Sequence, residues 1–268
     1  MKKLLLVALL LPFIACKQVG KESSDAKKDK MTSVKNAEKK YPEALSVVFY
    51  HHGGVNTWKK QRTLSYVLPK DKNPETHTID LWTRNEKIET PDYTIGFDGK
   101  PWVLDSNDSY KGNPEFYHNL MFYFYAMPFV LADDGIIYSE TEDLVFDGVS
   151  YPGIRISYDA GIGITPKDEY FIHYNAETYQ MEWLGYTVTY RSGKKSDNIK
   201  WIRYNDWKTV SDLVLPNSIS WYTVEDGKIT TLRNQVVFED VTLSEEAKST
   251  AFYHKPKKGE YWVKPLEK

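Results

Sequence analysis

The sequence predicts an α+β fold in which a curved antiparallel sheet holds a central apolar helix, with a further helix at the start of the domain. Three observations predict it. From Tyr41 onward, short segments that are apolar or β-branched at every second position alternate with turn residues, as in antiparallel strands. Residues 116–131 are apolar or aromatic all round, so other elements must enclose them. A many-stranded antiparallel sheet curls, and such a helix suits its concave side.

The N-terminus has the pattern of a bacterial lipoprotein signal. Lys2 and Lys3 precede an apolar run that ends at Ala15, directly before Cys16, the single cysteine of the chain. The run is too short to span a bilayer, which takes about 20 apolar residues. It resembles the lipoprotein box, in which the cysteine carries diacylglycerol and the chain is cut before it. An ordinary secretory signal with an incidental cysteine is the alternative.

We therefore expect a signal peptide at residues 1–15 and lipid attachment, including palmitate, at Cys16, with the protein on the periplasmic or cell-surface face of the outer membrane. Residues 16–40 contain no aromatic residue and read as a disordered tether. Residues 41–255 are long enough for one core and form one domain, followed by a C-terminal tail at 256–268. A net charge of −2 with no basic stripe argues against nucleic-acid binding.

The domain elements follow in order along the chain. Pro42 suits the first turn of a helix whose apolar face ends with His52, and Gly53-Gly54 ends that helix. Strand patterns then occur at 64–68, 79–83 and 93–97, and Asp98-Gly99 forms a hairpin turn. Further strand patterns follow the central helix at 155–158, 170–174, 180–183, 200–204, 219–222 and 229–238. Consecutive strands joined by short turns predict an antiparallel meander.

The central helix has its own boundary signals. Asn113 can cap it, and Pro114 suits its first turn. Of the next dozen residues, all but His118 and Asn119 are apolar or aromatic, Pro128 interrupts the pattern, and residues 129–131 add one more apolar turn. We expect one helix over residues 114–127 with its apolar surface covered by the sheet.

This order of elements resembles the LolA-like half-barrel. Closer still, His52-Gly53-Gly54 with Trp58, the segment 127–133 and the segment 166–170 resemble those of uncharacterised Bacteroidota lipoproteins. The LolA resemblance implies a curved sheet closed by helices around an apolar cavity that binds acyl chains or lipidated proteins. The closer group has no agreed activity, so that resemblance implies fold and location more than function.

The sequence predicts no catalytic residue, no metal ligands and no cofactor. Adjacent His51 and His52 point about 100° apart on a helix, so they do not match the spacing of two helical zinc ligands. We expect His52 on the packed face and His51 near solvent. No Gly-x-Ser-x-Gly elbow occurs, and Cys16 serves the anchor.

The leading hypothesis is a non-enzymatic lipoprotein that holds an apolar ligand between its sheet and residues 116–131. The ligand would be an acyl chain, a lipid or a lipidated protein, and the membrane would be a partner through the N-terminal anchor. The expected cavity lining is Trp58, Trp102, Leu120, Met121, Phe124 and Phe129.

Two alternatives stay open. A surface glycan-binding or glycan-processing protein would use Trp201, Trp207 and Trp221, which stand among polar neighbours and would form an exposed platform. A structural interaction module would instead have a solid core and no ligand.

Overall fold

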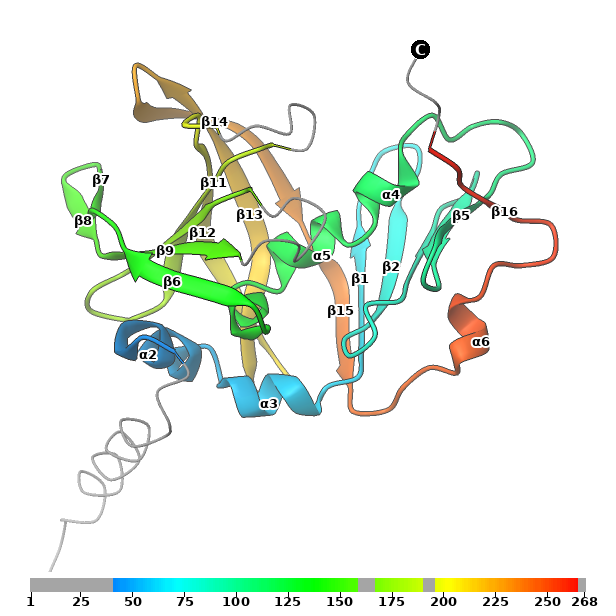
Figure 1. The fold of residues 1–268 in the computed structure, drawn as a ribbon, viewed down its shortest axis with the longest axis horizontal. Coiled ribbons are helices and arrows are strands. Elements are labelled where there is room, and N and C mark those ends of the chain that lie inside the picture. The colour runs from blue at the N-terminus through cyan, green and yellow to red at the C-terminus, as the bar shows by residue number, and fades with distance from the viewer. Residues whose placement is uncertain (1–40, 159–166, 190–195, 265–268) are drawn as a thin grey trace, which may run out of the picture. The chain divides into compact units, whose positions relative to one another are not determined.

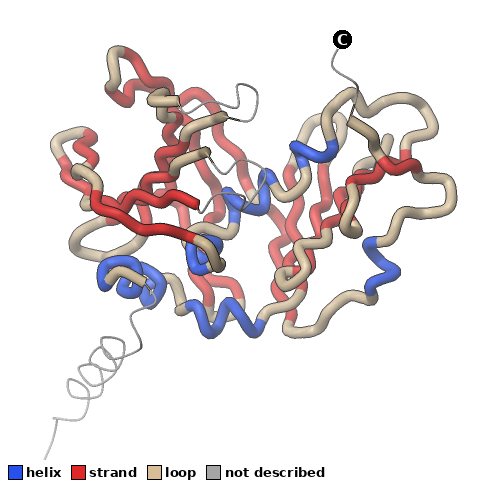
Figure 2. Tube along the Cα trace, viewed as in Figure 1, coloured by secondary structure: helices blue, strands red, loops and turns tan. Residues whose placement is uncertain are grey.

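Two antiparallel sheets form most of the structure, a computed structural model that describes residues 41–158, 167–189 and 196–264 (Figure 1). The predicted signal peptide, Cys16 and the tether lie outside the described residues. Helices are short, and strands and loops dominate (Figure 2). The predicted α+β class with an antiparallel sheet is confirmed.

Within the described residues, each of the two sheets has seven strands. In spatial order, the first sheet contains β15 (Glu239–Ser244), β1 (Thr63–Leu68), β2 (Glu75–Asp80), β3 (Glu86–Glu89), β4 (Thr94–Phe97), β5 (Pro101–Leu104) and β16 (Glu260–Tyr261). The second contains β14 (Lys228–Val237), β13 (Leu213–Glu225), β12 (Lys200–Val210), β11 (Met181–Tyr186), β10 (Tyr170–Tyr174), β9 (Gly153–Tyr158) and β6 (Ile136–Glu140). A separate hairpin contains β7 (Leu144–Phe146) and β8 (Val149–Tyr151).

The two sheets are joined by one strand that changes partner at Phe238. Before this residue β14 pairs with β13, with Val237 opposite Ser218, and after it β15 pairs with β1, with Glu239 opposite Val67. Phe238 is fully buried, its N–H donates to the carbonyl of Asn217 (2.9 Å), and its own carbonyl accepts from Lys208 Nζ (2.8 Å). The hydrogen-bonded surface therefore continues from one sheet into the other.

One predicted strand has different bounds. We expected a strand over residues 79–83, whereas β2 spans Glu75–Asp80. The carboxylate of Asp80 accepts hydrogen bonds from the backbone N–H groups of Trp82 and Thr83, both at 2.9 Å. This side chain forms a local turn in competition with the sheet, which ends the strand at Asp80.

The first helix, α2 (Glu43–His51), is placed as predicted. It buries Leu45, Val48 and Phe49, and α3 (Val55–Lys60), which the sequence did not predict, follows directly. His51 is exposed and His52 is fully buried. The Nε2 of His52 accepts from the N–H of Met181 (3.1 Å), so its Nδ1 donates to the carbonyl of Val214 (3.0 Å). Burial lowers the pKa of His52 to about 4, and the neutral ring ties α2 to the second sheet.

The central helix is broken, contrary to the prediction of one helix over 114–127. The structure has α4 (Pro114–Tyr117), α5 (Leu120–Tyr125) and a 3₁₀-helix, η1 (Phe129–Ala132). Asn119 separates α4 from α5 with a left-handed φ of 57°. Its N–H donates to the buried carboxylate of Glu86 (2.7 Å). In a continuous helix this N–H would instead donate to a backbone carbonyl one turn earlier. The cap by Asn113 is confirmed, since its side chain accepts from the N–H of Phe116 (3.1 Å).

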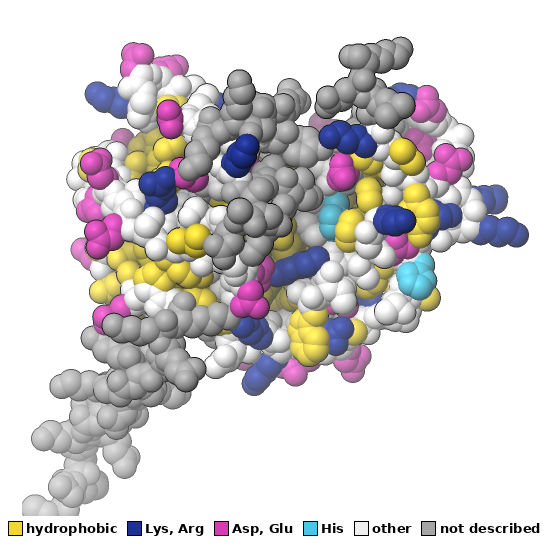
Figure 3. Space-filling model, viewed as in Figure 1, with side chains coloured by type: hydrophobic (Ala, Val, Ile, Leu, Met, Phe, Trp, Pro, Cys, Tyr) yellow, Lys and Arg dark blue, Asp and Glu magenta, His cyan; other side chains and the backbone are white. Residues whose placement is uncertain are grey.

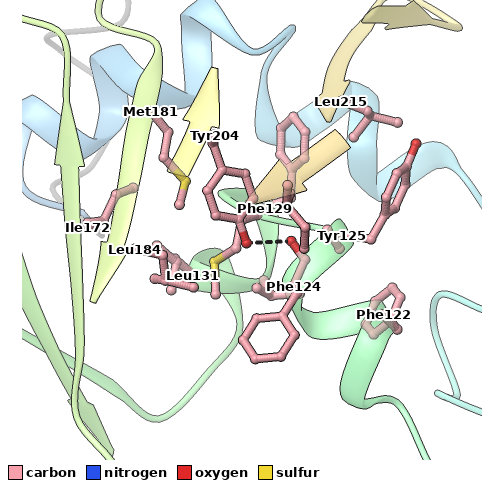
Figure 4. Close-up of a cluster of buried hydrophobic side chains, with 14 of the residues drawn as sticks. Phe122, Phe124, Tyr125, Phe129, Leu131, Ile172, Met181, Leu184, Tyr204 and Leu215 are labelled. Carbon is pink, nitrogen blue, oxygen red and sulfur yellow. Dashed lines mark hydrogen bonds between the residues drawn. The ribbon is translucent and has the colours of Figure 1, made fainter. Parts of the chain in front are cut away.

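The segment 113–133, which we call the central segment, packs against both sheets (Figure 1). The ring of Tyr125 lies 5.0 Å from that of Tyr66 in β1, and the ring of Phe124 lies 5.7 Å from that of Trp221 in β13. The hydroxyl of Tyr204 in β12 donates to the carbonyl of Phe124 at 2.8 Å (Figure 4). Most of the apolar surface of the segment is thus covered, whereas Phe116 and Tyr123 are 38% and 42% exposed.

The end of the chain also joins the sheet. Within the predicted tail 256–268, β16 pairs with β5, with Glu260 opposite Val103. A short helix, α6 (Thr250–Tyr253), precedes it. The described residues belong to one compact unit that spans residues 40–268. Among its described helices, none is long and apolar enough to cross a membrane.

Replacement of Gly53 by alanine tests the turn after α2. Gly53 has φ of +98°, and an added Cβ would lie 2.2 Å from the carbonyl oxygen of Asp212. We expect Gly53→Ala to lower the free energy of unfolding by about 3 kcal/mol or more, because backbone strain and a backbone clash add. Urea unfolding followed by circular dichroism measures it.

Gly54→Ala is the matched control. Gly54 has φ of +90°, but an added Cβ would meet nothing within 4 Å. Gly54→Ala should lower the free energy of unfolding only through backbone strain, by about 1–2 kcal/mol. Equal losses in the two variants would show that the contact with Asp212 does not constrain this turn.

Candidate functional site

A pocket lies at each end of the central segment. The first, of about 330 Å³, we call the α4 pocket, and it is lined by Lys70, Glu75, Tyr93, Tyr110, Gly112, Asn113, Phe116 and Tyr117. The second, of about 180 Å³, we call the η1 pocket, and it is lined by Trp58, Lys59, Gln61, Leu81, Trp82, Arg84, Phe129, Ala132 and Asp133. Apart from the central segment, the first sheet and its loops line the α4 pocket, whereas α3, Gln61 and the turn after β2 line the η1 pocket.

Aromatic side chains form the walls of the α4 pocket. The rings of Tyr93 and Tyr110 lie 5.0 Å apart, and α4 contributes Phe116 and Tyr117. Gly112 lets Tyr110 approach the backbone, since a Cβ there would lie 2.6 Å from the Tyr110 hydroxyl. Such walls offer apolar area together with hydroxyl groups, which suits an amphipathic ligand.

Polar groups form the floor of this pocket. The carboxylate of Glu75, only 3% exposed, accepts from the hydroxyl of Tyr117 (2.6 Å) and from Lys70 Nζ (2.5 Å). The Lys70 ammonium also donates to the Tyr117 hydroxyl (3.3 Å) and lies 5.6 Å from the Tyr117 ring centre. Because the Lys70 side chain is 47% exposed, its charge is at the border between the floor and solvent.

Behind the floor, four ionisable side chains form a line that we call the acid–histidine network: Glu75, His77, Glu86 and His118. His77 Nε2 lies 3.3 Å from a Glu75 oxygen, and His77 Nδ1 lies 3.0 Å from a Glu86 oxygen. The other Glu86 oxygen lies 3.3 Å from His118 Nδ1. His77 and Glu86 are completely or almost completely buried, so the network is shielded from water.

Burial and pairing act in opposite directions on these pKa values. Burial alone would raise the pKa of Glu75, but hydrogen bonds from His77, Lys70 and Tyr117 outweigh it and lower the pKa to about 2. Burial would also raise the pKa of Glu86, but hydrogen bonds from His118 and His77 outweigh it and lower the pKa to about 2. Burial would lower the pKa of His77, yet the two carboxylates raise it above 6.5. The two carboxylates therefore favour the protonated form of the buried His77 between them.

The sequence-predicted cavity residues are divided among several places. Trp58 and Phe129 stack at 5.0 Å and line the η1 pocket. Phe124 and Met121 are buried in the core, and Leu120 is half-buried against it. Trp102 lies apart in the first sheet, where its Nε1 donates to the carbonyl of Tyr253 (3.0 Å).

The expectation that Trp201, Trp207 and Trp221 form an exposed platform is wrong. Trp201 and Trp221 are 9% and 8% exposed, because they pack on opposite sides of the second sheet. Trp207 is half-buried, stacks on Tyr204 and donates its Nε1 to the carbonyl of that residue (3.0 Å). The polar neighbours that suggested exposure alternate with these residues along the strands and lie on the opposite faces.

Sequence reasoning missed the acid–histidine network. Glu75 and His77 are two positions apart in β2, so both point to the same face. A carboxylate and a histidine on the inward face of a strand are unusual and would have indicated a buried polar site. Their partner Glu86 comes from β3, which pairs with β2. In the described ranges, no three His, Cys, Asp or Glu side chains are arranged to hold a metal ion.

Comparison with known proteins gives a family and two similar folds. The sequence matches a family of unknown function, DUF6503, over residues 59–237, more than half of the chain. The chain belongs to this family. Comparison with curated proteins finds no match.

The solved structures that are similar to this DUF6503 chain include two bacterial proteins. A LolA superfamily protein from Nitrosomonas europaea has 10% sequence identity and a TM-score of 0.45, with 73% of this chain and 89% of that chain covered. A DUF1329 family protein from Desulfovibrio piger has 11% identity and a TM-score of 0.44, with 78% and 96% covered. Similarity at this level transfers no ligand or activity.

The pH dependence of stability tests the acid–histidine network. Folding raises the pKa of His77 above its ordinary value of 6.5, so protonation of His77 stabilises the folded protein. This contribution to stability is complete below pH 6.5 and is lost as pH rises through the folded pKa. Folding lowers the pKa values of Glu75 and Glu86 from 4.5 to about 2. Their contribution to the stability of the protein is complete above pH 4.5 and is lost as pH falls toward 2. The network should therefore stabilise most between pH 4.5 and 6.5.

His77→Gln should lower the free energy of unfolding by about 3–5 kcal/mol near pH 5.5, because two buried carboxylates lose their cation. The fall in stability as pH rises above 6.5 should disappear in this variant. His173→Gln is the control, because His173 is also buried but burial lowers its pKa, so this variant should keep the fall. Denaturant unfolding at several pH values measures both. An unchanged fall in His77→Gln would contradict a protonated His77.

Proposed function

We propose that this protein is a lipid-anchored outer-membrane protein that binds an amphipathic ligand in the α4 pocket without catalysing a reaction. The ligand is an acyl chain with a polar head, carried by a lipid or a lipidated protein. The observation that supports this most is the combination of four aromatic walls with a charged floor at Lys70, Glu75 and Tyr117.

The floor suits the polar end of such a ligand. A lysine ammonium has three N–H donors, and Lys70 directs one to Glu75 and one to the Tyr117 hydroxyl. Its third donor remains for a carboxylate, phosphate or ester oxygen of the ligand. The charges of Lys70 and His77 also balance those of Glu75 and Glu86, so an anionic or neutral head meets no net repulsion.

The walls suit the apolar end. Phe116 is 38% exposed and stands at the pocket, so a bound chain would cover its ring. A volume of about 330 Å³ is at the lower end of ligand pockets, which are about 300–1,000 Å³. The pocket thus accommodates the head and the first part of a chain, while the rest of the chain lies along the surface.

The location follows from the N-terminal sequence. The apolar run before Cys16 and the tether up to residue 40 support an acylated cysteine that holds the domain near the membrane. Tyr41, where the described residues begin, directly follows this tether.

Phe116→Ser tests the ligand site. The variant should lose about half of the free energy that burial of a phenylalanine ring provides, about 1–1.5 kcal/mol. Binding of a fluorescent fatty acid should therefore weaken about tenfold. Trp82→Ser in the η1 pocket is the control, because it removes an exposed aromatic ring from the other pocket. Binding is measured by titration of the full chain that carries Cys16→Ser, because a chain without an acylated cysteine needs no detergent. Absence of fatty-acid binding by the chain with an intact α4 pocket would favour the structural module without a ligand.

Cys16→Ser tests the anchor. We expect the unmodified chain to incorporate an alkyne-labelled palmitate and to sediment with membranes, and the variant to lose both properties. Metabolic labelling and membrane fractionation measure them. Membrane association that persists in the variant would indicate that another part of the chain holds it there.

A further inference from the structure

The η1 pocket differs from the α4 pocket in the groups that it offers. Its inner wall is the stacked pair Trp58 and Phe129, whose rings are nearly parallel at 8°. Its rim is Trp82, which is 62% exposed. A volume of about 180 Å³ corresponds to about six waters at about 30 Å³ each, which suits one small ring and not a lipid chain.

One polar side chain in this pocket makes no side-chain hydrogen bond with the described residues. Gln61 is 4% exposed and lines the pocket. Its backbone N–H donates to the carbonyl of Trp58 (3.0 Å), and its side-chain amide has no such partner. The amide can therefore both donate to and accept from a ligand in the pocket.

Three charged residues line the pocket, and two of them pair with each other. Arg84 Nη2 donates to both carboxylate oxygens of Asp133, at 3.0 and 2.7 Å. The buried Nη1 of Arg84 has no hydrogen-bond partner among the described residues, so a ligand oxygen can accept from it, whereas an apolar ligand would leave both Arg84 Nη1 and Gln61 without a partner. The Asp133 side chain is 41% exposed, and its carboxylate can still accept a hydrogen bond from a hydroxyl group.

The rim is held in place before any ligand binds. The guanidinium of Arg62 lies 4.0 Å from the centre of the Trp82 ring, and Trp82 Nε1 donates to the carbonyl of Lys59 (3.2 Å). Asp80 fixes both residues, since it accepts from the Trp82 N–H (2.9 Å) and from Arg62 (3.2 Å). A fixed aromatic rim lowers the entropy cost of binding a flat ligand.

We propose that the η1 pocket is a second binding site that takes a hydroxylated six-membered ring, such as the terminal hexose of a glycan. The ring stacks its C–H face on an aromatic side chain and places neighbouring hydroxyl groups against Gln61 and Asp133. Each hydroxyl both donates and accepts, which matches an amide beside a carboxylate. This inference is independent of the α4 pocket and of the lipid anchor.

Basic side chains of the pocket offer further donors to such a ring. Lys59 of α3 is exposed and lines the pocket together with the Arg84–Asp133 pair. A hydroxyl oxygen of the ligand can therefore accept a hydrogen bond from Lys59 as well. On the face shown in Figure 3, acidic and basic side chains of the described residues are interspersed, with no large region of one sign.

The test is saturation-transfer NMR and tryptophan fluorescence with the methyl glycosides of glucose, galactose, mannose and N-acetylglucosamine. The full chain carrying Cys16→Ser should bind at least one of them. Gln61→Leu, which keeps the size of the side chain, should weaken that binding about tenfold through a lost hydrogen bond to a polar ligand. Trp82→Ala, at an exposed position, should weaken it by a similar factor.

Two controls separate this site from the α4 pocket. Phe116→Ser should leave glycoside binding unchanged, and Gln61→Leu should leave fatty-acid binding unchanged. The proposal is overturned if none of the four glycosides binds, or if their binding is unaffected in both Gln61→Leu and Trp82→Ala. It is equally overturned if Gln61→Leu removes fatty-acid binding, since the η1 pocket would then belong to the lipid site.

Discussion

Contact between the central segment and the strand that changes sheets determines the rest of the structure. Tyr125 of the segment lies 4.5 Å from Phe238, and Tyr66 of β1 lies within 5.0 and 5.3 Å of these two rings. All three are fully buried. Since β14 and β15 meet at Phe238, these rings join the first sheet, the second sheet and the central segment in one core. The two pockets lie at the two ends of the segment that this contact holds.

The acid–histidine network lies directly beside that core. The ring of His77 stacks on Tyr66 at 4.8 Å, so the imidazolium is next to the aromatic contact that joins the sheets. Glu86 also fixes the break between α4 and α5 through the N–H of Asn119. A buried ion pair of this kind contributes little net stability compared with apolar packing, but removal of one member is costly. We infer that the network sets the position of α4, and with it the walls of the α4 pocket.

The sequence predicted some features well because local patterns determine them. The cap at Asn113, the buried face of α2 and the alternation of β1 depend on neighbouring residues, and all three are found. The helix break at Asn119 could not be predicted in this way, because its cause is the carboxylate of Glu86, 33 positions earlier. The α4 pocket likewise depends on the pairing of β2 with β3, which brings Glu86 to His77. Of the predicted cavity residues, Trp58 and Phe129 line the η1 pocket, whereas Met121 and Phe124 are enclosed in the core, because large apolar side chains pack in both places.

The most direct test of the central claim is photo-crosslinking of a fatty acid that carries a diazirine near its carboxyl end, followed by mass spectrometry of the peptides. Binding in the α4 pocket predicts crosslinks at Lys70, Tyr93, Tyr110 and Tyr117, reduced by an excess of unlabelled fatty acid. Crosslinks at Trp58 or Trp82, or labelling that unlabelled fatty acid does not reduce, would contradict the proposal that the α4 pocket binds the polar end of a lipid.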